Sequence, residues 1–554
     1  MEREPRTPTP IDELAERWLD QLLDLVPELH VELGRPGREG AYADLSPDGH
    51  AARDLATRRT LTAVRAAEPT DAVDRITRAE LIRTLELEAE QHDAGFWMAD
   101  LNVLASPAQG LREIFDLMPT DTTEHWEHVA DRMHRLPSAM AGYVASLRAG
   151  IRSGTTPAIR QVEAVAAQAE RHADPVHGFF GRTASSPKAP DELRGHLRDG
   201  AERAAGAYAH LRRFLRDELA PHARREDAVG RDWYALASRG FVGVEIDLEE
   251  TYAWGVEELA RMVSEQEAAA DAILPGAGVK EVVAHLESDP GRRLHGTDAL
   301  QAWMQRVSDR AVDDLGAMHF EIPEPVRRLE CRIAPTQEGG IYYTGPSEDF
   351  TRAGRMWWSV PEGVDAFDPW RELTTVYHEG VPGHHLQIGL ATYNSGQLNG
   401  WRRLNWNSGH GEGWALYAER LMADLGYLDD PADRLGMLDG QRMRAARVVA
   451  DIGAHLRLEK PDGSGRWTGE DVFPFMLEHV NMNEPFVRFE SDRYLGWAGQ
   501  APSYKVGQRL WEQLRDAWVA EHGPELKAFH AEALGVGSIG LGTLRTALLD
   551  PSAL

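Results

Sequence analysis

The chain contains very little cysteine and has a marked shortage of positive charge. Cys331 is the only cysteine among 554 residues, which excludes an intrachain disulfide framework and a cysteine-rich zinc or iron–sulfur site. Lysine and arginine together number 60 against 89 aspartates and glutamates, so the formal charge is −29. This excess predicts a strongly acidic outer surface and argues against nucleic acid or an anionic membrane as the main partner.

Long apolar runs are also missing. No uninterrupted apolar stretch approaches the roughly 20 residues that a membrane span requires. The first residues, MEREPRTPTPIDEL, lack the apolar centre of a signal peptide. We therefore expect a cytoplasmic protein without a membrane partner, in which any metal is held by histidine and carboxylate side chains.

Helical periodicity is present over most of the chain. Between Ile11 and Leu29, apolar residues such as Leu14, Trp18 and Leu22 recur every three or four positions, as on one face of a helix. No internal repeat and no long low-complexity linker interrupts such patterns. We predict a mainly α-helical fold: one large clam-shaped body enclosing a channel, with an N-terminal helical half at 1–320 and a catalytic half at 321–554.

The helical period fails between residues 327 and 360. Three short β-prone pieces, Leu329–Ile333, Gly340–Tyr343 and Arg355–Val360, are separated by clusters of Gly, Pro, Ser and Asp. This pattern predicts a small antiparallel sheet or a pair of hairpins. Because so short a sheet cannot be an independent domain, we expect it to pack against the helix that follows, either as a structural cover or as part of a site.

Two segments after these strands carry the residue types of a metal site. The first, TTVYHEGVPGHHLQIGLA, contains His378, Glu379, His384 and His385, and the second, GHGEGWALYAERLM, contains Glu412. A zinc hydrolase needs two imidazoles and a carboxylate as ligands, an open position for water, and a further carboxylate as base. The two segments supply all of these groups. The alternative is a Pro-Gly turn whose histidines serve only as hydrogen-bond partners.

The spacing of the histidines departs from the H-E-x-x-H signature, in which both histidines lie one helical turn apart. The next histidines follow His378 by six and seven residues. On an unbroken helix, six residues turn about 600° and seven rise about 10.5 Å, so neither pair converges on one ion. Pro382 lacks an N–H and must kink or restart the helix, and Gly383 permits the distortion. A bulge of this kind returns His384 to the site, while His385 stays open as the second ligand.

The string HEGVPGHHLQ, followed by GEGWALYAE and GQAPSYKVG, resembles a bacterial family known as domain of unknown function 885. The opening segment PELHVELG and the YYTGPSEDFTRAG hairpin belong to the same resemblance, which covers most of the chain. That family is similar, more distantly, to helical zinc peptidases such as thimet oligopeptidase, carboxypeptidase Taq and angiotensin-converting enzyme. The resemblance implies a metal-dependent peptidase.

The resemblance also implies roles for single residues. His378 and His384 match the two histidine ligands, and Glu379 matches the carboxylate that activates water. Glu412, 28 residues beyond His384, lies where those peptidases keep a third, glutamate ligand. His385 is the reserve ligand or a contact to substrate.

Further positions are expected to contact the substrate. Tyr342 and Tyr343 lie on the hairpin that corresponds to an edge strand pairing with a peptide backbone. Tyr504 and Lys505 match groups that polarise the scissile carbonyl or hold a terminal carboxylate, which agrees with the need of an oxyanion for a hydroxyl or ammonium donor.

Other polar residues near these segments have two interpretations each. Glu419 either orients a ligand histidine or is a structural carboxylate. The row of residues 447, 451 and 455 indicates either a buried ion-pair network or a wall of the site. The remaining candidates border Tyr504 and are expected to contact substrate: Arg493, Tyr494 and Gln500.

We predict that the protein is a zinc-dependent hydrolase of short peptides, with Zn²⁺ or another divalent metal as its cofactor. Glu379 is the predicted general base, and Tyr504 is the predicted donor to the oxyanion. Two rival hypotheses stay open. One is a metal-dependent hydrolase of a non-peptide amide or ester, and the other is a non-catalytic binding protein on a peptidase scaffold.

Overall fold

The computed structural model describes residues 5–334 and 340–554. Its first helix shows how the local sequence sets the elements. α1 (Pro10–Leu25) begins with a capping box, in which Thr9 and Asp12 exchange side-chain to backbone hydrogen bonds, and Pro10 takes the first helical position. Trp18 from the predicted apolar stripe is buried against the neighbouring helices. The mainly α-helical fold predicted from such patterns is confirmed.

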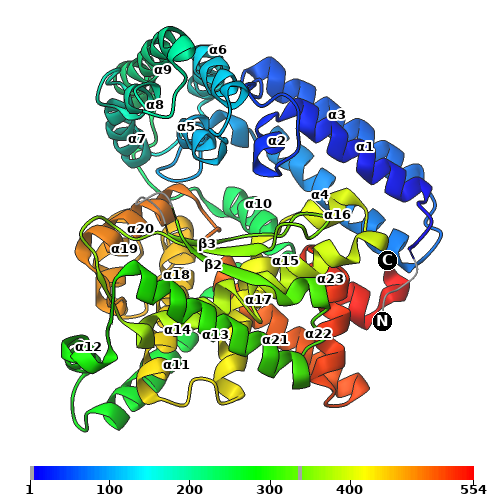
Figure 1. Cartoon of the computed structure of the whole chain (residues 1–554), viewed down its shortest axis with the longest axis vertical. Coiled ribbons are helices and arrows are strands. Elements are labelled where there is room, and N and C mark those ends of the chain that lie inside the picture. The colour runs from blue at the N-terminus through cyan, green and yellow to red at the C-terminus, as the bar shows by residue number, and fades with distance from the viewer. Residues whose placement is uncertain (1–4, 335–339) are drawn as a thin grey trace.

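The first nine helices make up the upper part of the molecule in Figure 1, drawn in blue to teal. Helices α1, α3 and α4 share one small core, and helices α5–α9 share a second one. Their bounds are α1 (Pro10–Leu25), α2 (Glu28–Glu32), α3 (Pro47–Ala66), α4 (Ala72–Asp93), α5 (Pro107–Leu117), α6 (Thr123–Ser153), α7 (Ile159–His172), α8 (Phe179–Ala184) and α9 (Arg194–Phe214).

The remaining helices make up the lower body and, except for α16, share the largest core, which runs from Tyr234 to Leu548, whereas Trp401 of α16 packs in the small core of α1, α3 and α4. Their bounds are α10 (Arg231–Val242), α11 (Leu248–Ile273), α12 (Val279–Ser288), α13 (Thr297–Met318), α14 (Pro369–Glu379), α15 (His384–Tyr393), α16 (Gly400–Leu404), α17 (Ser408–Asp424), α18 (Pro431–Leu456), α19 (Gly469–His479), α20 (Glu484–Gly496), α21 (Ser503–His522), α22 (Leu526–Gly535) and α23 (Leu541–Leu549). This core continues across residue 320, so the two predicted halves are packed as one body.

The predicted small sheet is present, but the prediction that it is antiparallel is wrong for one of its pairs. Strands β2 (Leu329–Ile333), β3 (Ile341–Thr344) and β4 (Gly354–Trp358) lie in the order β2-β4-β3. β4 is antiparallel to β3 and parallel to β2. β4 lies between the two earlier strands in the sheet, and it runs in the same direction as β2. Alternation of residue types predicts strands but carries no information about this order.

The sheet packs against the helices on either side of it in the chain. Met304 of α13, Cys331 of β2, Met356 of β4 and Val376 of α14 belong to one buried cluster. The expectation that the sheet packs on the helix that follows it is therefore confirmed. A separate two-stranded antiparallel sheet joins β1 (Leu294–His295) to β5 (Ala366–Phe367).

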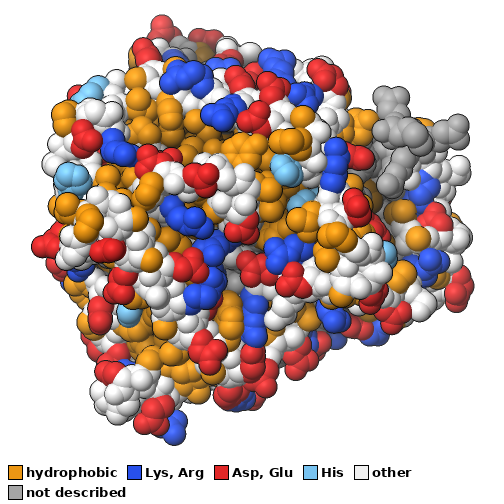
Figure 2. All heavy atoms as spheres, turned by 90° about the horizontal axis from the view of Figure 1, so that it is seen from below, with side chains coloured by type: hydrophobic (Ala, Val, Ile, Leu, Met, Phe, Trp, Pro, Cys, Tyr) orange, Lys and Arg blue, Asp and Glu red, His pale blue; other side chains and the backbone are white. Residues whose placement is uncertain are grey.

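Two features of the structure concern the expected partners: the distribution of charge on the surface and the apolar content of the helices. Acidic and basic side chains are interspersed over the face seen in Figure 2, so the negative excess is not gathered into one patch there. Within residues 5–334 and 340–554, no helix combines the length and apolar content needed to cross a membrane. The channel expected inside the body stays a prediction.

Candidate metal centre

The predicted interruption of the histidine helix is present. α14 ends at Glu379, α15 begins at His384, and the four residues between them form a tight turn with a cis bond before Pro382. The backbone N–H of Gly383 donates to the carbonyl of Tyr377 (3.1 Å). The turn therefore replaces the helical ladder that a proline cannot continue.

Gly383 is required by the close approach of two backbone segments. A Cβ atom at this position would lie 1.9 Å from the carbonyl oxygen of His378 and 2.5 Å from that of Tyr377. No side chain fits in that space. The absence of a Cβ thus allows the second helix to start directly beside the end of the first.

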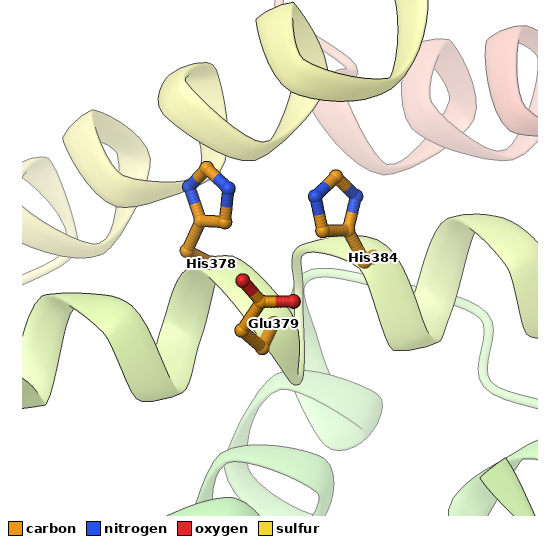
Figure 3. A group of neighbouring side chains, drawn as sticks. All are labelled: His378, Glu379 and His384. Atoms are coloured by element: carbon orange, nitrogen blue, oxygen red, sulfur yellow. The ribbon is translucent and has the colours of Figure 1, made fainter. Parts of the chain in front are cut away.

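His378 and His384 face each other across this turn, as Figure 3 shows. Their rings are nearly perpendicular, with centroids 4.9 Å apart. The carboxylate of Glu412, from α17, reaches both: its Oε2 lies 3.3 Å from Nε2 of His378 and 3.6 Å from Nε2 of His384. The Nε2 atoms of both histidines therefore lie within 3.6 Å of one oxygen of Glu412, and the three side chains come from three helices.

These separations fit a shared cation better than direct hydrogen bonds. Two ligands that are each 2.0–2.1 Å from one tetrahedral zinc ion are about 3.3–3.4 Å apart. A charge-assisted N–H···O bond would be shorter, at about 2.7–2.9 Å. Burial alone would raise the pKa of Glu412, but the two imidazoles hold it well below its usual range, so this carboxylate is ionised and able to bind a metal.

Glu379 lies directly beside the two histidines without being tied to either of them. Ligand-type atoms of His378, Glu379 and His384 all lie within 4.8 Å of one another, and Figure 3 shows the carboxylate between the two rings. The residue is 8% exposed. Burial raises the pKa of its carboxyl, partly offset by the two histidines. A carboxyl with a raised pKa beside a metal position suits the transfer of protons.

Glu419 is bonded to the ring nitrogen of His378 that faces away from Glu412. Nδ1 of His378 donates to Oε1 of Glu419 (2.8 Å), while the other carboxylate oxygen accepts from Thr374 (2.8 Å) and from Gln441 (3.4 Å). Because Nδ1 is bonded to Glu419, Nε2 is the nitrogen that faces Glu412 and that would bind a metal after losing its proton. Burial alone would lower the pKa of His378, but the two carboxylates raise it to about 10. Of the two interpretations of Glu419, the contact therefore favours orientation of a ligand histidine.

The structure does not bring His385 to the cluster. Its Nε2 donates to the carbonyl of Val326 (2.6 Å), and its Nδ1 accepts from the hydroxyl of Tyr343 (2.9 Å). Both ring nitrogens are used, and burial lowers the pKa of the imidazole to about 4, so the ring is neutral. His385 and Tyr343 thus fasten the sheet to α15, and His384 is the histidine that faces the metal position.

Tyr342 lies on the other side of strand β3. The side chain is 37% exposed and stacks on Trp357, with ring centroids 6.3 Å apart. β3 is an edge of the three-stranded sheet and contacts α14, the helix that carries His378. An edge strand in this position is compatible with the expected pairing to a peptide backbone.

Tyr504 lies near the cluster, at the start of α21. The negative charge of Glu412 acts on its hydroxyl, and burial together with that charge raises the pKa of Tyr504 to about 12. The guanidinium of Arg447 lies over its ring, 5.3 Å from the centroid. Tyr504 is therefore a neutral hydroxyl donor held beside a metal-ligand position.

Lys505 points elsewhere. Its Nζ donates to Gln441 (2.6 Å) and Gln508 (2.9 Å) and pairs with Glu258 of α11 (2.9 Å), in a site that is 1% exposed. The structure thus assigns this lysine to the packing of α11, α18 and α21. Adjacent positions on a helix differ by about 100° in direction, which is why Tyr504 and Lys505 face different neighbours.

The polar row on α18 forms a buried network. Arg447 donates to Tyr494 (2.7 Å) and Glu490 (2.7 Å), and Asp451 accepts from the backbone N–H of Gly499 (3.0 Å). The other members of the network are Tyr234, His455, Arg493 and Gln500. These bonds fix the segment that leads from α20 to Tyr504. The polar row on α18 therefore supports the candidate site by holding the backbone segment that precedes Tyr504.

Arg444 is a candidate that the sequence patterns missed. It lies on α18 three residues after Gln441, which reaches Glu419, and three before Arg447, which lies over Tyr504. Positions three apart differ by about 60° in direction, so Arg444 lies between those two contacts. Its charge acts on Glu379, Glu419 and Tyr504, yet within the described residues its guanidinium makes no hydrogen bond or ion pair, and its Nε is buried without a partner. Following the polar row of residues 447, 451 and 455 one helical turn back along the sequence would have found Arg444.

Two solved structures share this fold over almost the whole chain. The putative lipoprotein from Colwellia psychrerythraea is 20% identical with a TM-score of 0.84, and the alignment covers 98% of this chain and 99% of that one. A putative lipoprotein of unknown function from Shewanella oneidensis is 17% identical with a TM-score of 0.74, covering 98% and 100%. At these identities the likeness shows the fold alone. Among curated proteins, none matches the chain.

The prediction of a cytoplasmic location is contradicted by this comparison. Both similar structures are described as lipoproteins, a class that is attached to membranes through covalent lipid. The prediction rested on net charge, on the absence of long apolar runs and on the lack of a signal-peptide pattern in the first residues. Net charge and long apolar runs do not report on a lipid anchor, because the apolar part of such an anchor is not made of amino acids.

The family assignment made from the HEGVPGHHLQ string is confirmed. A model of one family matches residues 27–548, which include every residue of the candidate metal centre and both helical parts of the fold. The chain belongs to the family described as bacterial protein of unknown function DUF885.

Proposed function

We propose that the protein is a metal-dependent hydrolase that cleaves short peptides, with zinc as the metal that best suits the ligands. The convergence of His378, His384 and Glu412 carries this proposal, because their atoms are spaced like the ligands of one tetrahedral ion. The resemblance of the HEGVPGHHLQ string to helical zinc peptidases supports the choice of reaction.

A divalent cation held by these three side chains would supply a Lewis acid that activates water at neutral pH and polarises a carbonyl group. Glu379 then takes the proton of the attacking water and passes it to the leaving amine. Its raised pKa suits both steps, since it must accept and release a proton near neutral pH. A carboxylate already bound to a donor could not do this as readily, and within the described residues no hydrogen bond to Glu379 is formed.

Tyr504 supplies the donor for the oxygen that becomes negatively charged during attack. Its hydroxyl stays protonated because its pKa is raised to about 12. Such a neutral donor stabilises a developing oxyanion without competing as a base. Arg447 and its buried network act as positioning groups for this tyrosine.

Arg444 is proposed to hold the carboxylate of the substrate, in the role first expected of Lys505. A guanidinium that has no partner among residues 5–334 and 340–554 is free to form a bidentate pair with a carboxylate. The exposed edge of β3 is proposed to pair with the peptide backbone. Short peptides with a free C-terminus fit both features.

Metal analysis followed by a peptide panel tests the proposal. Protein purified without chelator is expected to contain close to one equivalent of a divalent transition metal, measured by inductively coupled plasma mass spectrometry. The metal-loaded protein is then expected to cleave short peptides with a free C-terminus and to cleave their C-terminal amides more slowly.

The same measurements separate the rival functions. Less than about a tenth of an equivalent of metal, with none taken up on titration, would favour a non-catalytic binding protein. Bound metal without cleavage of any peptide, together with cleavage of amide or ester metabolites, would favour a non-peptide hydrolase.

A further inference from the structure

A cavity lies where the N-terminal helices meet the lower body. Its volume is about 460 Å³, within the range of cavities that hold small ligands. α3, α4 and the short 3₁₀ helix η1 (Phe96–Met98) form one wall, and α10 with the segment 495–498 forms the other. No residue of the candidate metal centre lines it.

The walls of this cavity are rich in aromatic side chains. Phe96 and Trp233 stack face to face across the two parts of the molecule, with ring centroids 4.0 Å apart. Phe241 and Trp497 make an edge contact at 5.5 Å, and Trp97 stacks on His50 at 5.1 Å. Aromatic faces that remain partly exposed in a cavity attract apolar groups and cations.

Asp100 is an exposed residue that places its carboxylate on this aromatic wall. Its backbone carbonyl accepts from Tyr143 (2.6 Å), which holds the residue in place, but within the described residues its side chain forms no hydrogen bond or ion pair. The other carboxylates of the wall have donors: Asp54 accepts from Arg58 (2.8 Å), and Glu88 accepts from Thr57 (3.2 Å).

The basic groups of the wall do not form an ion pair with the carboxylate of Asp100. Arg224 donates to the backbone carbonyls of Thr156 (2.9 Å) and Ala228 (2.6 Å), and Arg53 lies 3.9 Å from Glu88. Burial, with the charges of Arg53 and His92, lowers the pKa of His50 to about 4, so this ring is neutral at pH 7.

We infer that this cavity binds an organic ammonium ion with an apolar or aromatic body. Asp100 forms the ion pair with the ammonium group, and the rings of Trp97, Trp233 and Trp497 enclose the body. The net charge of −29 favours the approach of a cation from solution. The ammonium group belongs either to a free amine or to the N-terminus of a peptide. The inference does not rest on the peptidase proposal.

Binding of 2-phenylethylamine to the full-length protein in EDTA tests this inference without any metal. Isothermal titration calorimetry and tryptophan fluorescence are expected to show binding at least about tenfold tighter than that of 2-phenylethanol, which has the same body without the charge. Asp100→Asn is expected to remove this difference. Asp54→Asn, the matched control on the same wall, is expected to keep it.

Two further arms complete the experiment. Phe-Gly is compared with its N-acetylated form and with 2-phenylethylamine. Tighter binding of Phe-Gly than of 2-phenylethylamine identifies a peptide N-terminus as the source of the ammonium group. Weaker binding of Phe-Gly identifies a free amine. Trp97→Leu is expected to weaken binding of both the amine and the alcohol. Equal affinity for amine and alcohol, unchanged selectivity in Asp100→Asn, or unchanged binding in Trp97→Leu would overturn the inference.

Discussion

At the scale of single residues, two glutamates near the predicted ligands differ in their surroundings. Glu379 directly follows His378 in sequence, and within the described residues its carboxylate forms no hydrogen bond or ion pair, whereas Glu419, seven residues after Glu412, is bound by three donors. Burial raises the pKa of the first carboxyl, and the donors hold the pKa of the second below its usual range despite burial. Environment, and not residue type, thus makes one suited to move protons and the other to stay ionised.

Glu379→Gln is expected to keep the metal and to lower turnover by about 10²–10⁴-fold, because the amide cannot accept the proton of the attacking water. Metal content and peptide hydrolysis are measured on the same sample. Glu372→Gln, two turns earlier on α14, is the control and is expected to stay active. Retained activity in Glu379→Gln would assign the base to another residue.

Glu419→Gln is expected to weaken metal binding by about 10–100-fold, because the neutral amide orients His378 less firmly and no longer increases its basicity. Competition with a chromogenic chelator measures the affinity. Asp424→Asn, on the exposed end of the same helix α17, is expected to bind metal as tightly as the unchanged protein. If Glu419→Gln does so too, the carboxylate is only structural.

At the scale of elements, the site depends on one helix ending where another begins. α14 brings His378 and α15 brings His384, and the turn between them sets how closely the two imidazoles approach. α17 supplies Glu412 from a third direction. The contacts of α18 and α21 with each other then place Tyr504.

Gly383→Ala is expected to abolish metal binding and to destabilise the protein by about 1–3 kcal/mol or more, because its Cβ would overlap the carbonyl of His378. Chemical unfolding and metal content check both effects. Gly206→Ala is the control, since a Cβ there meets nothing within 4 Å in the helix α9. It is expected to leave stability unchanged or slightly raised. Normal metal binding by Gly383→Ala would mean that the turn can relax.

At the scale of the whole molecule, the metal would connect three helices of the largest core that follow one another closely in the chain. Its ligands come from α14, α15 and α17, all within the largest core, and that core extends across residue 320. The aromatic cavity that Asp100 lines, by contrast, lies at the junction of this core with the N-terminal helices. Occupation of the two sites is therefore expected to affect different parts of the fold.

Zinc is expected to raise the midpoint of thermal unfolding, because it binds the assembled site and not the separated helices. At a free concentration 100 times its dissociation constant, the gain in the free energy of unfolding is about 2.7 kcal/mol. Differential scanning fluorimetry with zinc and with EDTA measures the shift. His384→Ala is expected to lose it, and an equal shift in that variant would place the metal elsewhere.

Local sequence patterns were enough to predict the fold class, the family and the two segments of the candidate metal centre. Periodicity in the segment around Trp18 is local, and so are the capping box at Thr9 and the break at Pro382, because each depends on residues within a few positions. The HEGVPGHHLQ string is likewise contiguous, so its likeness to the family needed no coordinates.

Only the tertiary structure decided which of these residues meet. It turned His384 toward Glu412 and His385 toward Val326, although the two histidines are neighbours in sequence. It also placed Lys505 against Glu258 and left Arg444, beside the candidate site, without a partner in the part of the chain that the structure describes. The strand order of the small sheet was decided in the same way. The direction of a side chain depends on packing between segments that lie tens to hundreds of residues apart, and no local pattern records that packing.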